Sequence, residues 1–380
     1  MKAPETTLHG KDTGAAGQLY MAMELSDKKW QLVVSDGKRA PSRYTVAAGD
    51  KAAVLAAIAK AKTRCGLVGA VVVHSCYEAG RDGFWLHRWL LEQGFANVVV
   101  DSASIEVNRR RRRAKTDRLD GDKLLTMLLR YHGGERRVWA VARVPTVEQE
   151  DVRRVHRELG RLQQEHTAHG NRIRSLLVLH DRRPKVIGGR GWDGWWEGQA
   201  VQLPPYVRAE IEREVARLQL VKAQIKALEA AQRQAVQAGS QALVAQLSGL
   251  RGIGLTSAWV LDKELLGWRQ FRNRREVAGS LGLAPTPYDS GDSRVEQGIA
   301  KAGNKRARWL LVELAWSWLR YQPNSALSQW FNARFAGGGK RMRRIGIVAL
   351  ARRLAIALWR YAKDGVIPAG AELKPVTAAA

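Results

Sequence analysis

Two carboxylates three residues apart follow a run of basic side chains near position 110. On a helix, Asp117 and Asp120 would lie on one face. Two acids in such a positive field are suited to bind a divalent cation, while the cations around them are suited to bind phosphate. The pairing indicates metal-assisted chemistry on nucleic acid. The basic residues of this segment are Arg109, Arg110, Arg111, Arg112, Arg113, Lys115 and Arg118.

The overall composition also indicates a polyanionic partner. The 380 residues include 63 Lys and Arg against 36 Asp and Glu, a formal charge of +27. Such a surplus attracts nucleic acid and makes binding salt-dependent. A hydrophobic fraction of 45% is enough for packed cores, and the length suggests two or three domains. No apolar run approaches the roughly 20 residues of a membrane helix, so we expect a cytoplasmic protein with no membrane contact.

The N-terminal part must contain the elements that position the acids. Its patterns predict three consecutive strands followed by alternating helices and strands, which is the order of a ribonuclease-H-like fold. The predicted elements are strands at 19–25, 30–34 and 42–46, a helix at 51–62, a strand at 67–73, a helix at 84–93, a strand at 97–101, and then the helix with Asp117 and Asp120.

In that fold, acids lie on the first strand, near the end of a later strand and as a pair on a following helix. Glu24, Glu78, Asp117 and Asp120 fill these places. Carboxylates converging from separate elements can hold two metal ions about 4 Å apart, and hard oxygen ligands favour Mg²⁺ or Mn²⁺ over zinc. Any one acid in a chain with 36 of them is more often a surface charge, so their order supports the set.

The middle of the chain, residues 145–240, is predicted to be a coiled-coil region. Thr146 with Gln149 three residues later is typical of a capping box. Apolar residues from Val152 to Leu176 recur at spacings of three and four, and a second such pattern runs from Ile211 to Leu228. We expect the two stretches to pair as an antiparallel or intermolecular coiled coil.

A loop rich in glycine and tryptophan, residues 181–205, is predicted between the two helical stretches. It is no phosphate cradle, because it lacks the GxxxxGK[ST] pattern and follows no strand. Trp192, Trp195 and Trp196 either stack on bases or pack against the coil.

The third part opens with a glycine turn. Gly252 and Gly254 are spaced as in a helix-hairpin-helix element, whose backbone N–H groups bind a DNA phosphate without reading bases; a plain turn between helices looks similar. Ser290 follows on a loop bounded by glycine and proline, with Arg294 and Lys301 nearby. An exposed hydroxyl in a phosphate-attracting field is a candidate nucleophile, although spacing by itself indicates an ordinary turn serine.

A last basic cluster follows three glycines and precedes helices whose tryptophans we expect in the core. It can contact a phosphate backbone or form a solvated surface. Its members are Lys340, Arg341, Arg343 and Arg344.

Taken together, the motifs resemble the DEDD-type insertion-sequence transposases, the IS one-ten family, from about Leu19 to Pro368. Each motif is weak, but their joint order is specific. The motifs are Glu24-Leu25-Ser26, Glu78-Ala79-Gly80, Lys115 to Asp120, Asn171 to Leu177, Gly252-Ile253-Gly254, Leu281 to Pro285, Ser290-Gly291 and Lys301 to Asn304.

The resemblance implies a DNA recombinase guided by a structured bridge RNA. It implies a flexible leader at 1–17, a RuvC-like catalytic domain at 18–144, the coiled coil at 145–240, a mostly helical transposase domain at 241–368 and a tail at 369–380. Glu24, Glu78, Asp117 and Asp120 would be the metal-binding tetrad. Ser290 would form a covalent phosphoserine link to cleaved DNA. Donor and target DNA, the RNA and a dimer or tetramer would then be its partners.

One departure and two rival functions remain. The family usually has Asp at the first tetrad position, where this chain has Glu24, and Asp27 on the adjacent turn is the substitute to test. A RuvC-like junction nuclease would need the acids but no serine. A non-catalytic scaffold for RNA or DNA would need neither.

Overall fold

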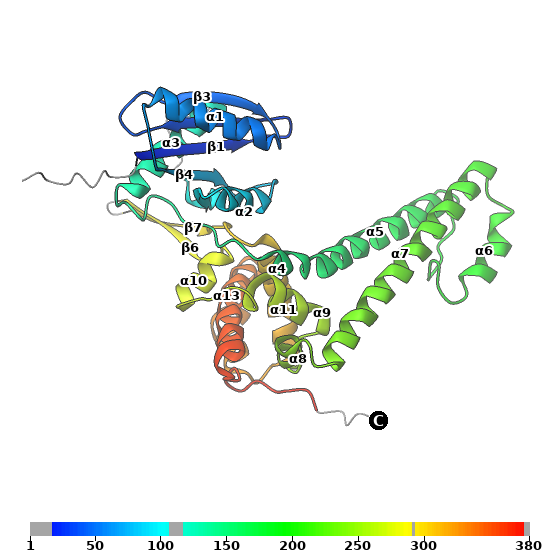
Figure 1. The fold of residues 1–380 in the computed structure, drawn as a ribbon. Coiled ribbons are helices and arrows are strands. Elements are labelled where there is room, and N and C mark those ends of the chain that lie inside the picture. The colour runs from blue at the N-terminus through cyan, green and yellow to red at the C-terminus, as the bar shows by residue number, and fades with distance from the viewer. Residues whose placement is uncertain (1–16, 106–116, 291–292, 376–380) are drawn as a thin grey trace, which may run out of the picture. The chain divides into compact units, whose positions relative to one another are not determined.

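The computed structural model describes residues 17–105, 117–290 and 293–375. The chain divides into two compact units, Met1–Pro145 and Thr146–Ala380 (Figure 1). The first unit combines strands and helices, and the second is mostly helical. The predicted mixture of an α/β part with helical parts is therefore confirmed.

A five-stranded mixed sheet forms the centre of the first unit. Its strands are β1 (Gly17–Leu25), β2 (Lys29–Ser35), β3 (Ser42–Ala47), β4 (Val71–Glu78) and β5 (Ala96–Val100), in the spatial order β3-β2-β1-β4-β5. Strand β1 pairs antiparallel with β2 and parallel with β4, and β5 is parallel to β4. The carboxyl ends of β1, β4 and β5 therefore meet at one edge of the sheet.

Helices cover both faces of this sheet, which explains why its strands are nearly continuous apolar runs. Because side chains alternate between faces, Met23 packs with α1 (Lys51–Arg64) and α2 (Trp85–Glu92) on one face. Ala22 packs with α3 (Asp117–His132) on the other. A short 3₁₀ turn, η1 (Ser102–Ser104), follows β5.

Strand β4 starts later than the strand predicted at 67–73. Gly69 has φ +80°, outside extended geometry, so the apolar run cannot begin the strand. The strand continues through polar positions because they are satisfied inside the unit: the Ser75 hydroxyl donates to Asn97 Oδ1 at 2.8 Å. As a consequence, Glu78 is the last residue of the strand rather than a loop residue beyond it.

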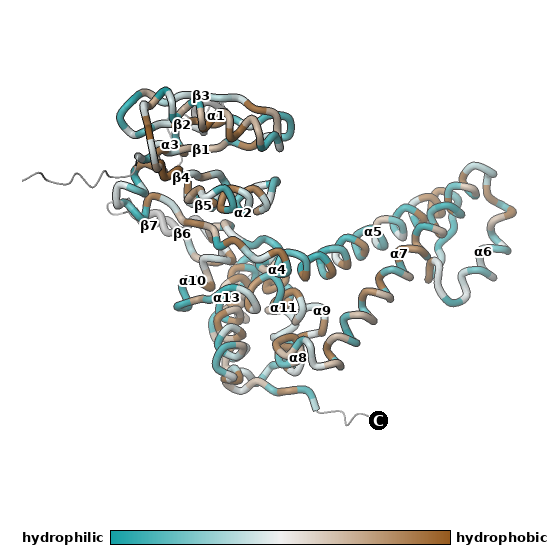
Figure 2. The backbone as a smooth tube through the Cα atoms, in the orientation of Figure 1, coloured by the Kyte–Doolittle hydropathy of each residue, from teal (hydrophilic) through white to brown (hydrophobic). Residues whose placement is uncertain are grey.

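Two long helices of the second unit, α5 (Arg154–Val178) and α7 (Pro205–Gln237), lie side by side and antiparallel (Figure 1). Hydrophilic and hydrophobic residues alternate along both (Figure 2). His169 Nδ1 lies 2.6 Å from Glu214 Oε2, which fixes their register. The two predicted stretches thus pair within one chain. Of the predicted seam residues, Leu159, Leu162 and Ile173 are buried, whereas Val152 is 41% exposed.

The short helix α4 (Val147–Asp151) precedes α5 and begins as predicted. Thr146 Oγ1 accepts from the Gln149 backbone N–H at 3.2 Å, and Gln149 Oε1 accepts from the Thr146 backbone N–H at 3.1 Å. Both bonds of the predicted capping box are therefore present.

The segment between α5 and α7 contains a helix, α6 (Trp192–Ala200), where a loop was predicted. Gly191, at φ +82°, turns the chain into this helix. Trp192 stacks on Trp196 at a centroid distance of 5.6 Å, and both pack with Leu218 into the hydrophobic core that α6 shares with α5 and α7. The helix forms because residues four apart share its buried face. Of the two alternatives for these rings, the structure shows packing against α5 and α7, and base stacking stays a hypothesis.

The remaining helices of the second unit enclose one hydrophobic core. Leu314 and Trp318 from α11 pack there against Leu350 and Leu354 from α13. The elements are α8 (Ala242–Ser248), α9 (Leu255–Leu261), the π-helical turn η3 (Asp262–Leu266), α10 (Arg274–Ser280), α11 (Lys305–Tyr321), α12 (Ala326–Phe331), the π-helical turn η4 (Asn332–Ala336) and α13 (Lys340–Asp364).

A two-stranded antiparallel hairpin, β6 (Pro285–Ser290) and β7 (Ser293–Ile299), interrupts these helices. A loop was predicted here, because Pro285 and Pro287 weaken the strand pattern. Over the described parts of the chain, no helix is long and apolar enough to cross a membrane.

Candidate functional site

Glu24 and Glu78 occupy neighbouring positions at the carboxyl ends of β1 and β4. The parallel register pairs Met23 with Tyr77, so the next residue on each strand is the acid. Since side chains alternate, both acids lie on the face opposite to Met23 and Tyr77, which is the face covered by α3. Glu24 is partly buried and Glu78 is exposed. We call this the acid-bearing face of the sheet.

The first turns of α3 lie over the acid-bearing face. A Cβ atom on Gly121 would lie 2.8 Å from Val33 Cγ2 of β2, so the helix touches the sheet at this glycine. The neighbouring Asp120 is partly buried. Asp117 is the first residue of α3, and its side chain is outside the described part of the structure. The structure therefore brings the Asp120 segment onto the same face as the two glutamates.

The oxygen donors at this face are of the kind that Mg²⁺ prefers. Among the described side chains, however, no three or more His, Cys, Asp or Glu groups come close enough to hold a metal ion. The side chain of Asp117 is not among these described side chains. The metal tetrad of Glu24, Glu78, Asp117 and Asp120 stays a prediction.

Two further acids lie at the carboxyl edge of the sheet. Asp27, the substitute for Glu24, is 81% exposed, and its Oδ1 lies 3.1 Å from Arg81 Nη1. Asp101 follows the last residue of β5 and was not among the predicted site residues. The sequence does contain a pattern that could have identified Asp101, because this acid follows a strand of valines just as Glu78 ends β4. Glu78 itself lies opposite Val100 in the register of β4 and β5.

Ser290 is the last residue of β6, opposite Ser293 in the antiparallel register. The serine thus lies at the distal end of a hairpin, not on the predicted open loop. The side chains of Ser290 and Arg294 are outside the described part of the structure.

The base of this hairpin is held by close backbone packing between two glycine motifs. Gly282 has φ +63° and Gly303 has φ +102°. A Cβ on Gly282 would lie 2.0 Å from the Ala302 carbonyl oxygen, and one on Gly303 would lie 2.3 Å from the Ser280 carbonyl oxygen. The Lys301 N–H donates to the Gly282 carbonyl at 3.0 Å. Only glycine fits at either position, which explains both motifs as the support of the hairpin.

A buried carboxylate connects this support to α5. Glu264, in the π-helical turn η3, is 2% exposed. Its Oε1 lies 2.8 Å from His156 Nε2 and accepts from Arg157 Nε at 2.7 Å, and its Oε2 accepts from Asn304 Nδ2 at 3.0 Å. Burial raises the pKa of Glu264, but the hydrogen bonds from His156, Arg157 and Asn304 outweigh burial and hold it well below its usual range. Glu264 was not among the site residues predicted from the sequence.

The predicted helix-hairpin-helix element consists of α8, α9 and the glycine turn between them. Gly252 has φ +85°, and its carbonyl accepts from Ser317 Oγ at 2.8 Å. Lys374 Nζ donates to the Ile253 carbonyl at 2.8 Å, so the C-terminal segment packs on the same turn. Gly254 is exposed. The described contacts give the turn a structural role, and phosphate binding there stays a prediction.

A wide basic groove lies along α13. It encloses about 1310 Å³ between α10, the base of the β6–β7 hairpin, α12 and one face of α13. Four predicted nucleic-acid contacts line it, although they come from separate segments: Lys301, Lys340, Arg341 and Arg344. Arg274 and Arg352 are among five further basic lining residues. No described lining residue is acidic. Arg343 is exposed but does not line the groove.

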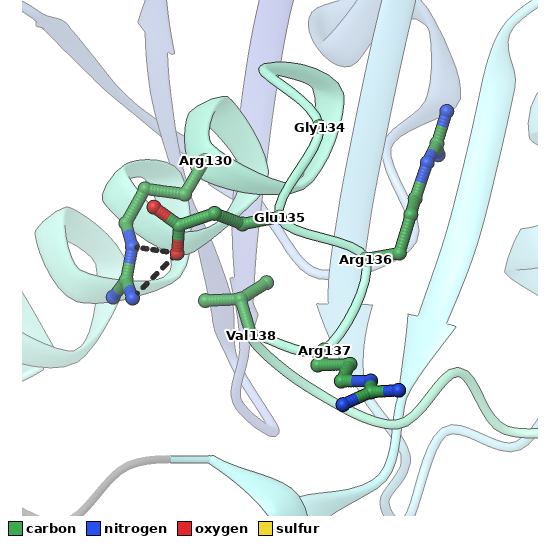
Figure 3. Close-up of a pocket in the computed structure, with 6 residues that line it drawn as sticks. All are labelled: Arg130, Gly134, Glu135, Arg136, Arg137 and Val138. Atoms are coloured by element: carbon green, nitrogen blue, oxygen red, sulfur yellow. Dashed lines mark hydrogen bonds and ion pairs between the residues drawn. The ribbon is translucent and has the colours of Figure 1, made fainter.

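A second, smaller hollow of about 420 Å³ follows α3 in the first unit (Figure 3). Arg130 Nη2 lies 2.7 Å from Glu135 Oε2, so its charge is balanced. The guanidinium of Arg136 lies over the Tyr131 ring at 4.6 Å. Arg136 and Arg137 point apart (Figure 3), so this hollow does not focus charge on a common point.

The remaining predicted contacts precede or begin α3. The run Arg109–Arg113 and Lys115 lies outside the described residues, and so does the side chain of Arg118.

Acids at the edge of a parallel strand pair and a wide basic groove are features of proteins that act on nucleic acid. Comparison with known proteins makes the class specific. A family model described as "Transposase IS116/IS110/IS902 family" matches residues 244–329. The "Putative transposase y4rJ" of Sinorhizobium fredii (strain NBRC 101917 / NGR234) is 43% identical over 386 residues, which cover 94% of this chain and 95% of the relative.

More distant relatives carry the same description. The "Probable family 20 transposase" of Pseudomonas aeruginosa is 31% identical over 57% of this chain and 64% of its own length. The "Transposase for insertion sequence element IS1111A" of Coxiella burnetii is 26% identical over 77% of each chain. The chain belongs to the IS116/IS110/IS902 family of transposases.

Proposed function

We propose that the protein is the transposase of an insertion sequence and that it cuts and rejoins DNA through a covalent link to Ser290. The observation that carries this proposal is the position of Ser290 at the end of a hairpin whose base is fixed by Gly282 and Gly303. This hairpin lies within residues 244–329, the segment that matches the family model.

The first unit is proposed to be a RuvC-like nuclease domain. Its strand order β3-β2-β1-β4-β5, with only β2 antiparallel to both neighbours, supports a ribonuclease-H-like fold. The adjacent positions of Glu24 and Glu78, together with the approach of Asp120 to the same face, support the acids as the metal-binding set. Bound Mg²⁺ would act as a Lewis acid on the phosphate oxygens.

The proposed serine chemistry needs no energy source. Ser290 Oγ attacks the phosphorus of a DNA strand, and a P–Oγ bond forms while the P–O bond to the leaving sugar breaks. The hydroxyl proton ends on the leaving sugar oxygen. The phosphoserine ester retains the energy of the broken phosphodiester, so a sugar hydroxyl of another strand can reverse the step. Basic side chains nearby stabilise the charge on the phosphate.

RNA guidance and oligomerisation complete the proposal. A net charge of +27 suits simultaneous binding of DNA and a structured RNA from the same element. Exchange of strands between two duplexes requires several nucleophiles, so a dimer or tetramer is the expected active form.

The test uses cells that express the protein beside a plasmid carrying the gene's native flanking DNA. Mg²⁺-containing lysates are resolved on denaturing gels and probed for protein covalently bound to plasmid DNA. We expect the adduct for the wild type, its loss for Ser290→Ala and Asp120→Asn, and its retention for Ser293→Ala, the matched serine across the hairpin. Removing the noncoding flank from the plasmid should also abolish it.

Each part of this experiment has an outcome that would contradict a different part of the proposal. An adduct that persists in Ser290→Ala excludes this serine as the nucleophile. Full activity of Asp120→Asn or in excess EDTA excludes the metal-binding role of the acids. Full activity without the noncoding flank excludes an RNA guide from that region.

A further inference from the structure

The basic groove along α13 has the charge of a polyanion site. Nine basic side chains line it, and among the described lining residues there is no carboxylate. None of the nine forms an ion pair with a described carboxylate. Arg341, Arg344, Arg352 and Arg360 recur at spacings of three, eight and eight along α13, so they follow one side of the helix. Unneutralised charge at this density attracts phosphate groups.

Apolar side chains also line the same groove, which is unusual for a site that would bind only phosphate; we call them its floor and the basic side chains its rim. Ile345, Val348 and Ile356 continue the lining face of α13, and Leu283 and Ile299 line the groove from the region of the hairpin base. Ile345 is 48% exposed. A surface that alternates basic and apolar side chains in this way requires a ligand with both kinds of group.

A DNA duplex does not match this floor. Its outer surface is phosphate and sugar, and phosphates pressed onto Ile345 and Val348 would lose water without gaining hydrogen bonds. A single strand exposes the flat faces of its bases as well as its phosphates. Bases stack on apolar and aromatic surfaces at about 1–3 kcal/mol each, while the backbone follows basic side chains.

One stacking platform is already assembled in the groove. The Arg353 guanidinium lies over the Trp330 ring at 4.0 Å, and Phe335 contacts the edge of that ring at 5.5 Å. Trp330 and Arg353 both line the groove, and Arg353 is exposed. A guanidinium that lies over a tryptophan ring can itself stack on a base.

The groove is bounded by the hairpin that carries Ser290. Pro285 at the start of β6 and Ile299 at the end of β7 line it, and Ser290 is at the other end of β6. We propose that this groove binds a single DNA strand, with bases on the apolar floor and phosphates on the basic rim, beside the serine hairpin. This inference rests on the proposed function, because a single strand bound in the groove would be useful to the reaction only if Ser290 is the nucleophile.

The test is fluorescence anisotropy of the full-length protein with labelled twelve-residue oligo(dT), a twelve-base-pair duplex and oligo(rU). The rim is tested by Arg344→Ala against Arg334→Ala, an exposed arginine outside the groove. The floor is tested by Ile345→Ala against Met342→Ala, which is similarly exposed outside the groove. We expect Arg344→Ala to weaken oligo(dT) binding about fivefold and Ile345→Ala about threefold. Both controls should stay within twofold, and duplex binding should be unchanged.

Three results would overturn the inference. Equal losses of duplex and single-strand binding would make the groove a general phosphate surface. Equal effects of Ile345→Ala and Met342→Ala on oligo(dT) binding would show that the bases do not contact the floor. Tighter binding of oligo(rU), with the same dependence on Arg344, would assign the groove to RNA. Ser290→Ala should bind oligo(dT) as the wild type does, so failure of strand binding and failure of serine chemistry remain separate readouts.

Discussion

Glu264 Oε2 accepts a hydrogen bond from Asn304 Nδ2 at 3.0 Å, although the two residues are 40 positions apart. Asn304 also caps α11, because its Oδ1 accepts from the Ala307 N–H at 3.0 Å. Since Asn304 directly follows Gly303, one buried carboxylate fixes the start of α11, the support of the serine hairpin and, through His156, the start of α5.

Glu264→Ala should destabilise the second unit. Removing the carboxylate leaves His156 buried and Arg157 partly buried without their partner, and breaking one side of a buried ion pair costs about 3–5 kcal/mol. The loss of stability is measured as the shift in the urea midpoint for unfolding of the helical second unit, followed by circular dichroism. Glu212→Ala breaks the exposed pair with Arg208 and is the control, at about 0–1 kcal/mol. Similar losses in the two variants would show that the buried carboxylate stabilises the second unit no more than an exposed ion pair does.

The same carboxylate should make stability depend on acid pH. Its folded pKa lies below the ordinary value, so its contribution is present above the unfolded pKa, about 4.3, and is lost as pH falls below that value toward the folded pKa. Glu264→Gln keeps the shape but cannot titrate. The wild type should therefore lose more stability than Glu264→Gln between pH 5 and 3, as urea midpoints would show.

His132 should give the first unit a separate pH dependence. Burial, then the nearby His74 and Arg136, lower the pKa of His132 to about 4. The folded state thus binds fewer protons than the unfolded state between the unfolded value of about 6.5 and the folded value. Stability is fully present above the unfolded pKa and falls as pH drops toward 4.

His132→Asn should therefore show a smaller loss of urea midpoint between pH 7 and 5 than the wild type. His180→Asn, which lies in the second unit, is the control and should follow the wild type. An unchanged pH profile in His132→Asn would contradict a neutral, partly buried imidazole.

Gly282→Ala should disrupt the support of the serine hairpin. The positive φ costs about 1–3 kcal/mol for a residue with a side chain, and the new Cβ would overlap the Ala302 carbonyl. Gly279→Ala is the control, since a Cβ there meets nothing within 4 Å and Ala favours the helix. Covalent adduct formation and the unfolding midpoint should fall only in the first variant. Normal adduct yield from Gly282→Ala would show that hairpin position is unimportant.

Gln322→Ala should release the C-terminal segment. The buried amide donates through Nε2 to the carbonyls of Arg251 and Glu372, at 3.0 and 2.8 Å, and its Oε1 accepts from the Glu372 N–H at 2.8 Å. Three lost hydrogen bonds cost about 2 kcal/mol. Hydrogen exchange at Glu372 should accelerate at least tenfold, whereas the exposed Gln329→Ala should leave it unchanged.

Local patterns predicted most of the sheet. Strands β1 and β3 begin or end within two residues of their predicted bounds, because apolar runs between turn residues determine them. The strand predicted at 67–73 was displaced to 71–78, since a left-handed glycine and a buried Ser75–Asn97 hydrogen bond depend on the assembled sheet. The loop predicted around Ser290 was wrong for a similar reason. Two prolines and a glycine are typical of a loop, and the packing between Gly282 and Gly303 that supports the β6–β7 hairpin forms only in the folded chain.

The candidate site was predictable in its residue types but not in its geometry. The order of the acids along the predicted elements was enough to propose Glu24 and Glu78, and the register of β1 and β4 then placed them side by side. Glu264 could not be found this way, because its partners are 40 and 108 positions away. The basic groove likewise unites Lys301 with α13, and no linear cluster connects them.

The placement of β1 between β2 and β4 restricts how this gene can change. A one-residue insertion or deletion between Gly17 and Glu24 would turn Glu24 to the opposite side of the sheet and present Met23 or Leu25, respectively, to the start of α3. Length variation among relatives should therefore collect in the connecting turns, while codon gains or losses inside this strand should eliminate transposition outright.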